Sequence, residues 1–115
     1  MPAKKLLVRR IRELIESAAL LRGALQRYEK TMAGIADRLE GGEAAVTAAK
    51  GTQIPSERRR VTEAIEEFEA ARHELRLALI GAGTAEGASL SEIGQVLGIS
   101  RQLASRLAGE VRRKT

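Results

Sequence analysis

The feature that most constrains this chain is a heptad pattern of apolar residues between residues 7 and 39. Apolar side chains recur there at alternating steps of four and three, in a stretch without proline. Such a pattern predicts one long helix with a narrow apolar seam. The predicted helix spans residues 3–40 and would be roughly 50 Å long at about 1.5 Å per residue. The seam consists of Leu7, Ile11, Leu14, Ala18, Leu21, Leu25, Tyr28, Met32, Ile35 and Leu39.

An apolar seam of this length must be covered, because exposed apolar surface is unfavourable in water. A second helix is predicted at residues 56–81, with Ser56 as its N-cap after Pro55. Its apolar residues repeat the steps of four and three: Val61, Ile65, Phe68, Leu75 and Leu79. The long helix is therefore expected to pack on this helix as an antiparallel hairpin, to form a dimeric coiled coil, or both. Residues 40–57 between them are predicted to be a linker with a short helical turn.

A glycine-rich loop is predicted at residues 81–89, followed by two short helices. Ser89 and Glu92 match the S-x-x-E capping box, which predicts a helix from Leu90 to Leu97. Gly98 is expected to end that helix in the left-handed conformation. Ser100 is then the predicted cap of a last helix over 101–113. With no convincing strand, the chain is predicted to be all-α.

The spacing within residues 89–113 is typical of a helix-turn-helix, in which two short helices meet across a tight turn. Gly94 provides the small residue where the helices touch, and Gly98 the turn. Apolar residues are placed to fill the angle between the helices: Ile93, Leu97, Ile99, Leu103 or Ala104, and Leu107.

The stretch LSEIGQVLGISRQLASRLAGEV resembles the helix-turn-helix superfamily of transcriptional regulators, especially region 4 of sigma factors and short regulators with that module. Ala104 departs from the superfamily, which usually has a larger branched residue there. The resemblance implies that the second helix enters the major groove of double-stranded DNA. The base-reading positions that it implies are Ser100, Arg101, Gln102, Ser105 and Arg106.

The charge distribution favours a polyanionic partner at both ends of the chain. The net charge of +5 divides into +4 for residues 1–55, −2 for residues 56–88 and +3 for residues 89–115. Phosphate contacts are predicted for the basic residues that follow the base-reading positions. They are also predicted for the basic residues at the start of the second helix, because the helix dipole disfavours cations there unless an anion is bound. These residues are Arg112, Arg113, Lys114, Arg58, Arg59 and Arg60.

Several function classes find no support in the composition. The chain has no cysteine and one histidine, so a metal site is not expected, and neither is a cofactor. No paired carboxylates or activated nucleophile indicate an enzyme, and no small-molecule ligand is evident. No apolar run reaches the roughly 20 residues of a membrane span, so we expect a cytoplasmic, nucleoid-associated location.

These observations predict an N-terminal dimerisation region, residues 1–55, and a DNA-binding domain, residues 56–115. The expected function is a homodimeric, sequence-preferring DNA-binding protein, which would be a transcriptional regulator, with a nucleoid-associated protein as an alternative. Another alternative is a protein-interaction adaptor whose long helix binds a partner such as RNA polymerase or another coiled coil. A third is the detached DNA-binding tail of a recombinase or transposase.

Overall fold

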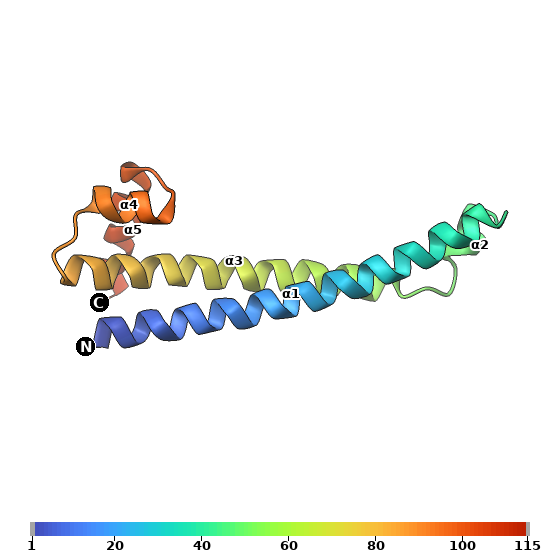
Figure 1. Ribbon diagram of the computed structural model, residues 1–115, viewed down its shortest axis with the longest axis horizontal. Helices are drawn as coiled ribbons and strands as arrows, with labels where there is room; N and C mark the ends of the chain where they lie inside the picture. Colours follow the sequence, from blue (N-terminus) through green and yellow to red (C-terminus); the bar gives the residue numbers. More distant parts are fainter. Residues whose placement is uncertain (1, 115) are drawn as a thin grey trace. The chain divides into compact units, whose positions relative to one another are not determined.

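The computed structural model describes residues 2–114, and in that part of the chain it contains five α-helices and no strand. The protein is therefore all-α (Figure 1). The helices are α1 (Pro2–Glu40), α2 (Ala45–Ala49), α3 (Ile54–Ala85), α4 (Leu90–Leu97) and α5 (Arg101–Lys114). As expected from the heptad pattern, α1 is a single long helix, and the predicted linker contains one short helix.

The second long helix differs from its prediction at both ends. It begins at Ile54, two residues before Ser56, so the prediction of Ser56 as N-cap was wrong. The Ser56 hydroxyl instead donates to the Gln53 carbonyl oxygen at 3.1 Å. The helix continues to Ala85, through the first part of the predicted glycine-rich loop. Thr84 supports this extension, because its hydroxyl donates to the Ile80 carbonyl oxygen at 2.8 Å.

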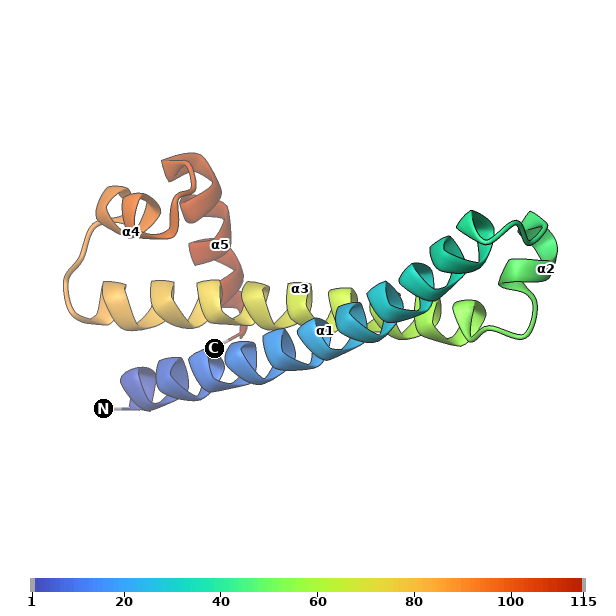
Figure 2. The ribbon, with the colours of Figure 1, turned by 45° about the vertical axis from the view of Figure 1, so that its right-hand side comes forward.

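The chain divides into two compact units, each of which contains part of α1 and part of α3. The first unit comprises residues 1–16 and 69–115, and the second comprises residues 17–68. In the second unit, the two long helices run beside each other in opposite directions, and α2 lies in the connection between them (Figures 1 and 2).

The apolar core of the first unit lies among the last turns of α3, α4 and α5. Leu77 and Ile80 from α3, Ile93 from α4 and Leu107 from α5 form its buried centre. Figure 2 shows α5 running across α3 rather than along it. Side chains around the turn complete this core, so that the three helices form one packed body.

Candidate nucleic-acid interface

The start of α4 is fixed by the capping box that the sequence predicts. The Glu92 backbone N–H donates to the Ser89 hydroxyl at 3.1 Å, and the Ser89 backbone N–H donates to the Glu92 carboxylate at 3.0 Å. These bonds satisfy backbone donors that a helix start otherwise leaves unpaired. The hydrogen bond from the Ser89 backbone lowers the pKa of Glu92, and the bond between the two side chains adds to the effect.

The turn between α4 and α5 depends on two glycines. Gly98 ends α4 with a φ of 70°, a left-handed conformation that favours glycine. The Ile99 N–H donates to the Gly94 carbonyl oxygen at 2.9 Å, which folds the chain back on α4. Gly94 is buried, and a Cβ atom there would stand 3.1 Å from the Ile99 carbonyl oxygen. The predicted small residue at this contact is therefore favoured by a close backbone approach.

The inner face of α5 anchors it on the core. Ala104 is completely buried, and Leu107 and Ala108 are buried one turn later. Leu103, next to Ala104, is half-buried and packs against the core. The small residue at position 104 thus leaves no exposed gap, because the surrounding side chains close over it.

The five predicted base-reading residues are all exposed. Arg101 and Gln102 are followed one turn later by Ser105 and Arg106, so these four share the side of α5 opposite Ala104 and Leu107. Ser100 precedes them, and its hydroxyl accepts from the Leu103 backbone N–H at 3.0 Å, which makes it the cap of α5. We call Ser100, Arg101, Gln102, Ser105 and Arg106 the outward face of α5.

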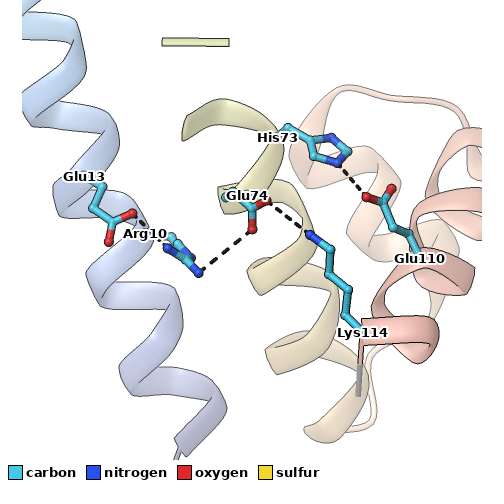
Figure 3. A network of polar contacts seen from close by, with 6 residues as sticks. All are labelled: Arg10, Glu13, His73, Glu74, Glu110 and Lys114. Atoms are coloured by element: carbon cyan, nitrogen blue, oxygen red, sulfur yellow. Dashed lines mark hydrogen bonds and ion pairs between the residues drawn. The ribbon is translucent and has the colours of Figure 1, made fainter. Parts of the chain in front are cut away.

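Ion pairs hold the far end of α5 to α3 (Figure 3). His73 and Glu110 are hydrogen-bonded at 2.9 Å, and this bond lowers the pKa of the Glu110 carboxyl. The Lys114 ammonium lies 3.2 Å from a Glu74 oxygen, and Arg10 of α1 lies 4.0 Å from the other. Glu110 is the only acidic residue of α5. Because it is directed to His73, the outward face carries positive charge without a neighbouring carboxylate from its own helix.

Sequence reasoning missed this ion-pair network. Within α3, His73 stands four residues after Glu69, but Glu69 pairs with Arg72. The partners of His73 and Lys114 are 37 and 40 residues away in sequence, and no local pattern indicates pairs of that separation.

The predicted phosphate-contacting residues fall into two groups. Arg112, Arg113 and Lys114 are exposed in the last turn of α5, where Lys114 also serves the ion pair with Glu74. The group Arg58, Arg59 and Arg60 is exposed in the first turns of α3 and belongs to the second unit. The structure does not bring these two groups together in one unit.

The predicted seam of α1 is unevenly covered. Ile11, Leu25 and Leu39 keep about two fifths of their surface exposed. The remaining predicted seam residues are half-buried: Leu7, Leu14, Ala18, Leu21, Tyr28, Met32 and Ile35. Two further aliphatic side chains, Val8 and Ile15, are exposed close to Ile11, and Ile15 retains 63% of its surface. The first turns of α1 thus present apolar surface that the heptad pattern alone does not indicate.

Comparisons with protein families, curated proteins and solved structures found no match to this chain. Within residues 2–114, no helix is long and apolar enough to cross a membrane. In the same part of the chain, no group of three or more acidic, histidine or cysteine side chains is arranged to hold a metal ion.

Proposed function

We propose that α4 and α5 form a DNA-binding helix-turn-helix and that the outward face of α5 reads bases in the major groove. The observation that carries this proposal is that all five outward-face residues are exposed, whereas the opposite side of α5 is buried in the core. Arginine can pair with guanine through two hydrogen bonds, and glutamine with adenine in the same way. Serine hydroxyls can contact either bases or phosphates.

In this proposal the last turn of α5 supplies phosphate contacts. Arg113 is exposed beyond the outward face, so it would meet the DNA backbone rather than base edges. Such contacts give affinity that is independent of sequence and falls with salt. Arg58, Arg59 and Arg60 are proposed as further phosphate contacts, supported only by their exposure and charge at the start of α3.

A gel shift on genomic DNA fragments at about 50 mM salt tests the reading face. The test variant replaces Arg101, Gln102 and Arg106 with alanine. A matched control replaces Arg22, Gln26 and Arg27 on α1, which are also two arginines and one glutamine and are likewise exposed. We expect the control to shift DNA as the wild type does and the test variant to lose the shift. Equal binding by both variants, or no binding by the wild type, would contradict the proposal.

We also propose that the protein is a homodimer, which would place two reading helices on successive major grooves about 34 Å apart. The exposed aliphatic side chains Val8, Ile11 and Ile15 support a contact through α1. The test replaces Ile11 and Ile15 with aspartate, because both side chains are exposed. The seam residue Leu14 is half-buried, so aspartate there would also disturb folding. Sedimentation equilibrium should show a monomer for this double variant and a dimer for Gln26→Asp. A persistent dimer would place the interface elsewhere.

The proposed biological role is that of a transcriptional regulator, with nucleoid architecture as the alternative. The exposed apolar surface of α1 also favours a second candidate, in which α1 binds another protein and the chain acts as an adaptor. The gel shift described above separates the two functions, because the regulator requires DNA binding by the outward face of α5 and the adaptor does not.

A further inference from the structure

A cationic groove lies in the second unit, between the last turns of α1 and the segment that follows α2. It has a volume of about 320 Å³ and is lined by eight residues. Three of them are cations, Lys30, Arg38 and Lys50, and none of the described residues that line it is an aspartate or glutamate. We call this site the cationic groove. All three side chains are exposed, so water and salt screen their mutual repulsion, and an anion between them would reduce it further.

The far wall of the groove is held in place by hydrogen bonds. The Arg38 guanidinium donates to the Ala48 carbonyl oxygen at 3.3 Å, and the Thr52 hydroxyl donates to the Ala49 carbonyl oxygen at 2.6 Å. Arginine has five N–H donors, so this bond leaves others that can point to a ligand. The arginine is therefore oriented before any ligand arrives, which lowers the entropic cost of binding.

The floor of the groove contains a glycine that helix packing does not require. Gly34 lies in the interior of α1, one turn after Lys30 and one turn before Arg38. Glycine is among the least favourable residues in a helix interior, and, apart from its chain neighbours and the adjacent helix backbone, no atom lies within 4 Å of the place where a Cβ would stand. No neighbour therefore explains the missing side chain. Its effect is to keep the space between Lys30 and Arg38 open.

We propose that the cationic groove binds the phosphate group of a phosphorylated molecule. Lysine supplies point charges for such a group, and the planar arginine can donate two parallel hydrogen bonds to its oxygens. The groove is at the lower end of the size range of ligand sites, which is enough for a phosphate and part of the molecule that carries it. The phosphate can belong to a small molecule or to a nucleic-acid backbone.

The test titrates the full, ¹⁵N-labelled chain with inorganic phosphate and follows the amide resonances of Gly34 and Gly51, which both line the groove. The test variant is Lys30→Gln with Lys50→Gln, which leaves the Arg38 bond to Ala48 intact. The control variant is Arg22→Gln with Arg27→Gln on the same helix, outside the groove. We expect affinity to fall by roughly tenfold or more in the test variant and to stay unchanged in the control. No shift in the wild type, or equal affinity in both variants, would overturn the proposal.

Gly34→Leu separates loss of the site from loss of the fold. Leucine fills the groove floor but is a better helix former than glycine, so thermal stability should be kept or raised while phosphate binding is lost. Phosphate binding that survives this substitution would refute the role of the open floor.

A second titration identifies the source of the phosphate. It uses duplex DNA and the variant with alanine at Arg101, Gln102 and Arg106. Shifts at Gly34 and Gly51 with duplex DNA support a nucleic-acid backbone, whereas shifts with inorganic phosphate alone support a small phosphorylated molecule. Since this variant leaves the groove intact, failure of the proposed DNA reading by α5 would not remove phosphate binding here.

Discussion

Replacement of Gly94 by alanine tests whether the turn between α4 and α5 depends on close backbone contact. In an ordinary helix interior, glycine to alanine stabilises the fold by about 1 kcal/mol. At Gly94, the new Cβ would stand 3.1 Å from the Ile99 carbonyl oxygen, and contacts below 3.4 Å require the neighbour to move. Ile99 cannot move freely, because its own N–H is bonded to the Gly94 carbonyl oxygen. Overpacking of this kind costs about 1–3 kcal/mol. The expected net effect is therefore a destabilisation of about 1 kcal/mol.

Gly81→Ala is the matched control in α3. Its Cβ would meet only the Val111 side chain, at an ordinary 3.8 Å, so this variant should gain about 1 kcal/mol. Urea unfolding followed by circular dichroism measures both free energies of unfolding. For a chain of this size, the two melting temperatures should move in opposite directions by about 4 °C each. A Gly94→Ala variant that is stabilised as much as Gly81→Ala would refute the reasoning.

Four further predictions concern the same unit. Leu107→Ala should lower the free energy of unfolding by about 2–5 kcal/mol, because it leaves a cavity in the core; urea unfolding at wild-type midpoint would contradict this. Ser89→Ala should cost about 0.5–2 kcal/mol in the same assay through loss of the α4 cap. The pKa of Glu110 is lowered from 4.5 by its bond with His73, so this bond stabilises the fold above that pH and its contribution is lost as the pH falls through the lowered pKa. Acid unfolding of Glu110→Gln should accordingly begin from a lower stability at pH 7 and decline less steeply than that of the wild type. Arg113→Ala should reduce the slope of log affinity against log salt by about 1, with equal loss on all DNA sequences, whereas a loss confined to one sequence would make Arg113 a base contact.

The local signals in the last third of the chain predicted its helices well. The start and the end of α4 depend on local interactions. Ser89 and Glu92 form the capping box three residues apart, and Gly98 ends the helix in the left-handed conformation. Such short-range interactions can be recognised from the sequence. The long helix α1 was also predictable, because a heptad pattern without proline has few other structures available.

The end of α3 could not be predicted in this way, because tertiary contacts decide it. Gly81 and Gly83 suggested a loop, but both lie inside the helix. A Cβ at Gly83 would stand 2.9 Å from the Cδ1 atom of Ile93, which would have to shift, so glycine here accommodates the approach of α4 rather than making a turn. A glycine can mark a turn or can allow two helices to pack closely. The sequence alone does not distinguish these two roles.

The sequence predicted which residues of the candidate site are exposed on α5, but it did not predict the ion pairs that hold α5 in place. The spacing of Arg101, Gln102 and Arg106 was enough to place them on one exposed side of a helix. The His73 to Glu110 pair, which directs the only carboxylate of α5 away from that side, joins residues too distant in sequence to be inferred. The exposed apolar residues Val8 and Ile15 were missed because the heptad pattern assigned the apolar face to other positions.

Genome-wide mapping of bound DNA tests most directly whether α5 reads base sequence. If the outward face reads bases in the major groove, the bound fragments should share a sharp consensus, and alanine at Arg101, Gln102 and Arg106 should abolish it. Broad coverage without a consensus, or no enrichment over input DNA, would contradict sequence reading by α5.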